Sequence, residues 1–206
     1  MDKKYDICHI SRLRMGIDGE GIRELILTAG CPLRCKYCIN PFTWDGDAHI
    51  EQLSAQEIYD RIKLDRPYIL ATNGGITIGG GEPLLQPELF RDMREVCEPA
   101  MTIYVETSLN VPWKNVETAS EYIDCFYIDI KAISADVYGK YTSGKLDTVL
   151  DNISKLVSRV GSNKAVIRIP IIPEYTNKND QHRAVETLKE MGIQKFDLFK
   201  YRKTIE

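Results

Sequence analysis

Short apolar runs alternate with amphipathic patterns along most of the chain. The apolar runs cover residues 25–29, 76–78, 101–105, 126–130, 165–172 and 196–199. Runs this apolar are typical of parallel strands that are buried on both faces. Their alternation with helical patterns predicts a mainly parallel α/β sheet with right-handed crossovers.

Four segments between these runs carry helical spacing. Ser54 and Glu57 form a capping box, which predicts the first residue of one helix. Gly192 stands in the position that ends another helix. The helical patterns cover residues 54–64, 87–96, 146–157 and 184–191.

The length of the chain limits the architecture. A closed barrel of eight strand–helix units takes ~250 residues, so six units need ~190 by proportion. The 206 residues fit six units. We therefore predict one α/β domain, a partial (β/α)6 barrel that is open on one side. It has an N-terminal extension without clear periodicity (1–21), a barrel core (22–199) and a short tail (200–206).

A cysteine-rich loop follows the first apolar run. Cys31, Cys35 and Cys38 stand at C-x3-C-x2-C spacing, so that three thiolates on one loop can face a common centre. A 4Fe–4S cluster normally takes four cysteines. Three ligands with no obvious fourth leave one iron open to a bound cofactor. The other cysteines are expected to be small, buried or half-buried thiols: Cys8, Cys97 and Cys125.

Other interpretations of the cysteines remain open. A zinc site would use three or four protein ligands, and His9 and His49 are the nearest histidines, but neither stands at a zinc-ligand spacing. The N-terminus is polar and shows no signal peptide, which favours a cytoplasmic chain with reduced thiols. We expect His9, His49 and His182 to be solvated residues.

Polar residues stand where the later strands end, at the edge where parallel sheets bind ligands. Gly79, Gly80 and Gly81 allow close approach of the backbone, and Glu82 adds an anion, although a plain glycine turn fits equally well. Asp129 and Lys131 share a strand face, so they form an ion pair or point together at a polar ligand.

Arg168 lies within an apolar strand and requires a carboxylate partner. Asp129 and Glu82 are candidates for that partner within the chain.

Three segments resemble a known family. The cysteine spacing, with Tyr37 before the last cysteine, resembles the radical S-adenosylmethionine (SAM) superfamily. Asp18-Gly-Glu-Gly-Ile-Arg23, the cysteine loop and Asn40-Pro-Phe-Thr-Trp44-Asp are similar in order to the activating enzymes of glycyl radical enzymes, such as the pyruvate formate-lyase type. The similarity runs from about Gly16 to about Arg202.

The resemblance implies a radical SAM barrel in which Cys31, Cys35 and Cys38 hold a 4Fe–4S cluster. That cluster cleaves SAM reductively to methionine and a 5′-deoxyadenosyl radical, which abstracts hydrogen from a substrate. The G-G-E motif implies a site for the SAM amino group, Arg168 suits its carboxylate, and Lys131 faces the active site. The implied cofactor contacts are Tyr37, Gly80, Gly81, Glu82, Glu106, Asp129, Lys131, Arg168 and Arg202.

Two positions depart from the family pattern. Glu106, Thr107 and Asp129, with the Tyr127 carbonyl, match positions that hold a monovalent cation near SAM, but Glu106 is one methylene longer than the family's aspartate. The run 200–202, Lys-Tyr-Arg, stands where the family has a Pro-Tyr-His that packs near the adenine.

The resemblance implies activation of a glycyl radical enzyme partner, with a flavodoxin or ferredoxin-type electron donor, in an anaerobic cytoplasm. We expect a monomer. Two alternatives remain: radical modification of a small molecule or peptide, including the deazaguanine-forming branch, and a non-catalytic iron–sulfur or zinc protein that binds a partner.

Bulk composition narrows the partners. Hydrophobic residues make up 43% and charged residues 28%, as in ordinary globular proteins, and the formal net charge is −3. Such a charge gives no sign of nucleic-acid binding. No apolar run approaches the ~20 residues that a membrane-spanning helix needs.

Overall fold

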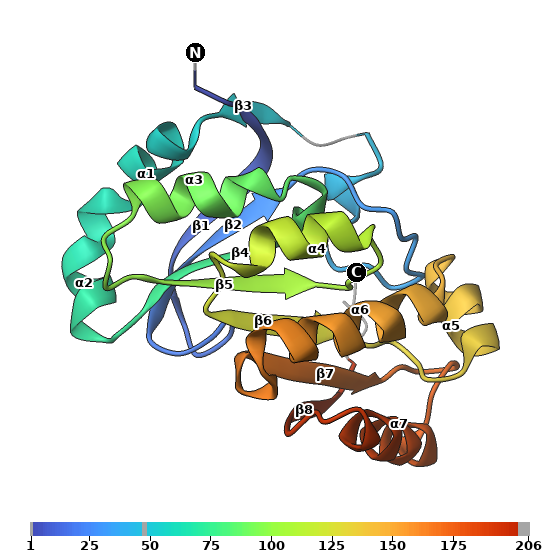
Figure 1. Ribbon diagram of the computed structural model, residues 1–206. Helices are drawn as coiled ribbons and strands as arrows, with labels where there is room; N and C mark the ends of the chain where they lie inside the picture. Colours follow the sequence, from blue (N-terminus) through green and yellow to red (C-terminus); the bar gives the residue numbers. More distant parts are fainter. Residues whose placement is uncertain (1, 47–48, 202–206) are drawn as a thin grey trace.

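The computed structural model describes residues 2–46 and 49–201 of the chain. Its eight strands form one curved sheet in the order β3-β1-β2-β4-β5-β6-β7-β8 (Figure 1). The strands are β1 (Tyr5–Met15), β2 (Ile22–Thr28), β3 (Glu51–Leu53), β4 (Gly75–Gly80), β5 (Thr102–Thr107), β6 (Cys125–Asp129), β7 (Ala165–Ile171) and β8 (Lys195–Lys200).

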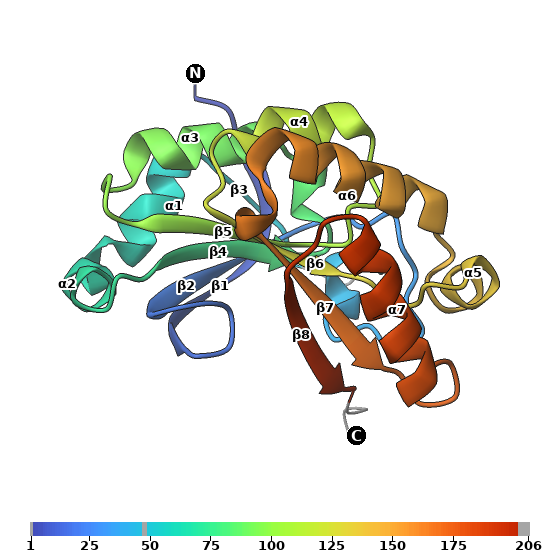
Figure 2. The ribbon, with the colours of Figure 1, turned by 60° about the horizontal axis from the view of Figure 1, so that its bottom comes forward.

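Six of these strands, β2 and β4 to β8, pair in parallel, each with the next along the chain. They coincide with the six apolar runs, so the partial (β/α)6 barrel is confirmed. The two remaining strands, β1 and β3, pair antiparallel at one edge. The barrel does not close, and its open side lies between β1 and β8 (Figure 2).

Helices cover the convex face of the sheet (Figure 2). The capping box at Ser54 is confirmed, because its side chain accepts from Glu57 N–H and the Glu57 carboxylate accepts from Ser54 N–H. The helices are α1 (Ala55–Ile62), α2 (Arg66–Ala71), α3 (Glu88–Val96), α4 (Trp113–Ser120), α5 (Ala135–Thr142), α6 (Leu146–Val160) and α7 (Lys178–Glu190), with short 3-10 helices at Pro41–Thr43, Lys63–Asp65, Pro83–Leu85 and Ser162–Lys164.

The N-terminal segment, which carried no clear period, joins the sheet. Residues 7–15 of β1 pair antiparallel with β2. Two register shifts, between Ile7 and His9 and between Ser11 and Arg14, interrupt its alternation. These β-bulges hide the period of two from sequence reading.

The apolar core lies between the sheet and the helices, where large side chains from both layers are fully buried. The concave face of the sheet carries charged and polar side chains among apolar ones. Fully buried Arg23 lies near the start of β2 and donates to Thr77 Oγ1 at 2.6 Å. Its Cζ atom lies 3.6 Å from the centroid of the Tyr104 ring. Thr77 Oγ1 in turn donates to the Asp18 carbonyl at 2.8 Å. These contacts fill the end of the barrel where the parallel strands begin. The end where the strands finish, and the open side, remain for a site.

Among the described residues, no helix is long and apolar enough to cross a membrane.

Candidate active site

The concave face contains a cavity of about 600 Å³. It extends from the loop after β2 to the open side of the barrel. Cys31, Cys35 and Cys38 line it together, as the sequence predicts. Other lining residues come from the ends of β4, β5, β6 and β7 and from β1: Gly80, Gly81, Glu106, Thr107, Asp129, Lys131, Arg168, His9, Ser11 and Arg14.

Backbone hydrogen bonds hold the cysteine loop against the end of α5. Arg34 N–H donates to the Thr142 carbonyl at 2.7 Å, and Lys36 N–H donates to the Tyr141 carbonyl at 3.0 Å. Within the loop, Cys38 N–H donates to the Cys35 carbonyl at 3.2 Å. These hydrogen bonds fix the backbone of the cysteine loop against α5.

The three cysteines of the loop are free thiols, as metal ligands must be. All three cysteines are half-buried and outside any disulfide. Burial raises the pKa of Cys31 to about 12 and that of Cys35 to about 11, so without a metal both are neutral. Bound iron deprotonates such thiols outright.

A metal cluster fits this arrangement better than a single ion. Within residues 2–46 and 49–201, no three His, Cys, Asp or Glu side chains converge tightly enough for one ion. In a cubane cluster each cysteine binds a different iron. The donor set of three thiols therefore fits a 4Fe–4S cluster with one iron open. The three histidines, His9, His49 and His182, are exposed, as expected.

The glycine-rich end of β4 packs directly beneath the cysteine loop. Gly81 N–H donates to the Thr28 carbonyl at 3.0 Å, and Glu82 N–H donates to the Gly30 carbonyl at 2.7 Å. A Cβ on Gly81 would lie 2.0 Å from the Gly30 carbonyl oxygen, and Gly80 has φ 108°. The glycines thus let two strand ends meet at the cavity.

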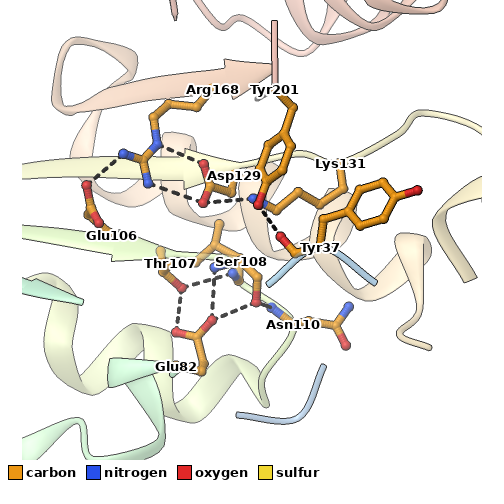
Figure 3. Close-up of polar contacts among 11 residues, drawn as sticks. Tyr37, Glu82, Glu106, Thr107, Ser108, Asn110, Asp129, Lys131, Arg168 and Tyr201 are labelled. Atoms are coloured by element: carbon orange, nitrogen blue, oxygen red, sulfur yellow. Dashed lines mark hydrogen bonds and ion pairs between the residues drawn. The ribbon is translucent and has the colours of Figure 1, made fainter. Parts of the chain in front are cut away.

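Glu82 faces into the protein and does not line the cavity. Its side chain is buried, and its two oxygens accept from the hydroxyl groups of Thr107 and Ser108, both at 2.6 Å, and from the N–H of Ser108 and Leu84 (Figure 3). Burial raises the pKa of Glu82 and these hydrogen bonds oppose the rise. The carboxylate therefore fixes the loop that follows β5.

Four charged side chains form a continuous chain of ion pairs across the cavity wall (Figure 3). Lys131 Nζ lies 3.0 Å from Asp129 Oδ2, and Asp129 Oδ1 accepts from Arg168 Nε at 2.7 Å. Arg168 Nη1 then donates to Glu106 Oε1 at 2.6 Å. The predicted Asp129–Lys131 pair is confirmed. Of the two candidate partners of Arg168 within the chain, Asp129 is confirmed and Glu82 is wrong. Glu106 is a second partner that the sequence analysis did not propose.

The electrostatics of this ion-pair chain are balanced. Burial raises the pKa of Asp129, but Arg168 and Lys131 outweigh burial and hold the pKa at about 2. Burial raises the pKa of Glu106 above its usual range, and Arg168 opposes that rise. Two cations and two carboxylates thus line the wall without excess charge. A charged ligand can bind here by replacing one of these partners.

Four tyrosines gather beside the cysteine loop. The Tyr201 hydroxyl donates to the Tyr37 carbonyl, and the Tyr37 hydroxyl donates to Glu174 at 2.9 Å. The rings of Tyr141 and Tyr175 meet edge to face, with centroids 4.9 Å apart. Tyr37 and Tyr201 belong to segments that the sequence analysis singled out, whereas Tyr141 and Tyr175 carried no motif. Arg202 lies outside the described residues.

With the geometry in place, comparisons with known proteins define the class. The Radical SAM superfamily model matches residues 25–196. The chain therefore belongs to the radical SAM superfamily and is an enzyme of that class. Membership implies a 4Fe–4S cluster and SAM.

Particular relatives narrow the type within that class. The chain is 33% identical to the pyruvate formate-lyase-activating enzyme of Clostridium pasteurianum, across 90% of this chain and 77% of that protein. It is 28% identical to the (2S)-3-sulfopropanediol dehydratase activating enzyme of Klebsiella oxytoca, across 85% and 74%. The protein is thus of the glycyl radical enzyme-activating type.

A solved structure supports the fold alone. Streptococcus suis SuiB bound to precursor peptide SuiA superimposes with a TM-score of 0.66 at 16% identity, covering 86% of this chain and 38% of SuiB.

Proposed function

We propose that this protein activates a glycyl radical enzyme by removing a hydrogen atom from a backbone glycine of that partner. The main support is the cavity, which is lined both by the three thiols of the C-x3-C-x2-C loop and by the polar residues at the strand ends. Two relatives support the proposal, because both bear the names of activating enzymes.

Cys31, Cys35 and Cys38 would hold three irons of the cluster, with the fourth iron open to SAM. When bound, the cluster would pass one electron from an external donor to SAM, for reductive cleavage to methionine and a 5′-deoxyadenosyl radical that would take the hydrogen atom. The chain itself holds the cysteine loop in place through the backbone hydrogen bonds to α5.

Arg168 and Lys131 are the groups that we assign to the SAM carboxylate. Both line the cavity, and their carboxylate partners can be exchanged for a ligand carboxylate. Gly80 and Gly81 offer backbone to the amino group at the same edge. Glu82 acts by holding Thr107 and Ser108 in place.

A monovalent cation is part of the same proposal. When Arg168 turns to the SAM carboxylate, Glu106 and Asp129 lose a shared countercharge. A cation bound by these carboxylates and Thr107 replaces that charge. Tyr37 and Tyr201, whose rings stack 6.3 Å apart, are the proposed neighbours of the adenine.

The wider setting is also proposed. We assign the chain as a single monomeric domain that works in an anaerobic cytoplasm with a flavodoxin or ferredoxin-type donor. The low-potential electron and the oxygen-sensitive cluster support that setting.

The test mixes reconstituted protein anaerobically with SAM, reductant and each glycyl radical enzyme encoded beside it. Electron paramagnetic resonance should show a glycyl radical doublet on one partner. Cys35→Ala should give no doublet, and Cys97→Ala, which alters a buried thiol away from the cavity, should retain it. SAM cleavage without a doublet on any partner contradicts the activating role and favours a small-molecule or peptide substrate.

A further inference from the structure

One strand beside the cavity has an unused edge. The strand β3 pairs only with Tyr5–Ile7 of β1, and β2 pairs with the other side of β1. Across the described residues, no strand pairs with the outer edge of residues 8–15. This edge borders the open side of the barrel (Figure 2).

Two hollows meet along this edge. His9, Ser11 and Arg14 line the cavity that contains the cysteines. Cys8, Ile10 and Arg12 line a second hollow, together with His49, Glu51 and Arg61, and His9 borders both hollows. Successive side chains of an added strand point to opposite faces, so they would enter the two hollows in turn. Peptide recognition by strand addition uses such alternate pockets for specificity.

A β-bulge aims the cationic side chain into the cavity. Ser11 stands opposite Leu25 and Arg14 opposite Arg23, so two residues of β1 oppose Glu24 alone. Without the extra residue, Leu13 would face the cavity instead of Arg14. Bulges beside active sites commonly redirect a side chain in this way.

One hydrogen bond stabilises the bulge, and one residue in it has an unfavourable backbone conformation. Leu13 N–H donates to Glu24 Oε1 at 3.2 Å, and the Glu24 side chain is fully buried. Leu13 itself has φ 56°, a conformation that disfavours leucine, and its side chain is 44% exposed. The strand therefore keeps Leu13 in an unfavourable backbone conformation, and this bulge places Arg14 in the cavity.

The charge of the edge selects its occupant. Residues 7–17 contain Arg12 and Arg14 and no acidic residue, and Arg12 is already paired through Nε and Nη2 with buried Asp65. Arg14 Nε and Nη2 donate to Asp18, while Nη1 has no hydrogen-bond partner within the described part of the chain. A second copy of the same edge would bring arginine against arginine, and like charges facing each other across strands are unfavourable.

We propose that residues 8–15 of β1 bind an extended acidic segment of the partner protein as an added β-strand. The inference rests on the proposed function, because it takes the glycine-bearing partner as the occupant. His9 and Arg14 are separated by roughly 13 Å along the strand. A segment whose glycine lies beside His9 therefore presents its acidic side chain to Arg14 about four residues away.

The probes are two fluorescein-labelled peptides with one glycine, followed at the fourth and fifth positions by Asp-Glu or by Asn-Gln, and the same pair in reversed order. Binding to the reconstituted protein with SAM is measured by fluorescence anisotropy. One acidic peptide should bind at least tenfold more tightly than its amide counterpart. Arg14→Gln should remove most of that preference, and Arg14→Lys should restore part of it.

Hydrogen exchange distinguishes strand addition from simple charge attraction. The acidic peptide should slow amide exchange in residues 8–15 at least tenfold and leave β8, the other open edge, unchanged. Arg159→Gln is the matched control, because it removes an arginine from the outer face of α6, where Arg159 pairs with Glu117 and Glu121. It should bind both peptides as the wild type does.

Equal binding of acidic and amide peptides, or protection of β8 in place of β1, overturns the proposal. SAM cleavage is assayed in the same preparations. Wild-type protein that cleaves SAM but shows no protection of β1 disproves the edge and leaves the proposed function standing. Protection of β1 in a protein that cannot cleave SAM supports the edge and contradicts the proposed function.

Discussion

The two walls of the cavity are built in different ways. The cysteine wall consists of the loop 31–38 and the strand ends 80–81, 106–108 and 129–131, each a short contiguous motif. The β1 wall consists of His9, Ser11 and Arg14, and Arg14 faces the cavity because a bulge after Ser11 turns it there. Reactive groups are thus set by local motifs, whereas the wall that we assign to the partner depends on an irregularity.

The cysteine wall should tolerate no added atoms where its strand ends meet. In Gly81→Ala the new Cβ would overlap the Gly30 carbonyl, which belongs to rigid backbone. We expect a loss of about 4 kcal/mol or more in the free energy of unfolding, measured with denaturant. Gly139→Ala is the control, because its Cβ meets nothing closer than 3.9 Å in α5, and it should gain about 0.5–1 kcal/mol.

The ion-pair chain should be nearly as sensitive. Arg168→Met leaves Glu106 and Asp129 facing the cavity with Lys131 as their remaining cation. Loss of one partner of a buried ion pair costs about 3–5 kcal/mol, which chemical unfolding at neutral pH would measure. The surface variant Arg159→Met should cost less than about 1 kcal/mol. An equal effect of the two variants would contradict the buried network.

Glu24, which accepts a hydrogen bond from the bulge of β1, should make the free energy of unfolding depend on pH. Burial raises the pKa of Glu24 from its ordinary 4.5 to about 7, with Asp65 raising it and Arg12 opposing the rise. The folded state then binds a proton that the unfolded state releases, so stability falls as the pH rises from about 4.5 to about 7. Glu24→Gln should remove roughly 1–2 kcal/mol of that fall. An unchanged pH profile in the variant would contradict the assignment.

The smallest expected effect concerns the bulge itself. Leu13→Gly relieves the left-handed conformation of residue 13 and removes an exposed leucine. We expect stability to change by less than about 1 kcal/mol, in the favourable direction. Leu64→Gly removes a more exposed leucine (73% against 44%) from the 3-10 helix Lys63–Asp65, where no left-handed conformation is relieved, and should destabilise. A large loss in Leu13→Gly would show that the leucine side chain is needed.

The sequence was sufficient for the barrel and the cysteine wall. Buried parallel strands are apolar throughout, so their runs stand out, and the loops that follow them carry compact motifs. The capping box at Ser54 is equally local. Each of these features depends on residues that are close together in the chain.

The remaining features depend on residues that are distant in sequence or on irregular backbone. Two bulges in β1 break its alternation, so residues 1–21 carried no readable period. Glu106 reaches Arg168 across 62 residues, and Tyr201 reaches Tyr37 across 164. Glu82 points into the protein because the hydroxyl groups of Thr107 and Ser108 donate hydrogen bonds to its carboxylate there, which its motif did not reveal.

If the cysteine wall holds the cluster, the protein should cleave SAM reductively. The assay measures 5′-deoxyadenosine and methionine released by anaerobically reconstituted protein given dithionite and SAM, beside Cys35→Ala and Cys97→Ala. We expect equal amounts of both products from the wild type and from Cys97→Ala, and none from Cys35→Ala. Products that persist at the wild-type level in Cys35→Ala would contradict this role of the cysteine wall.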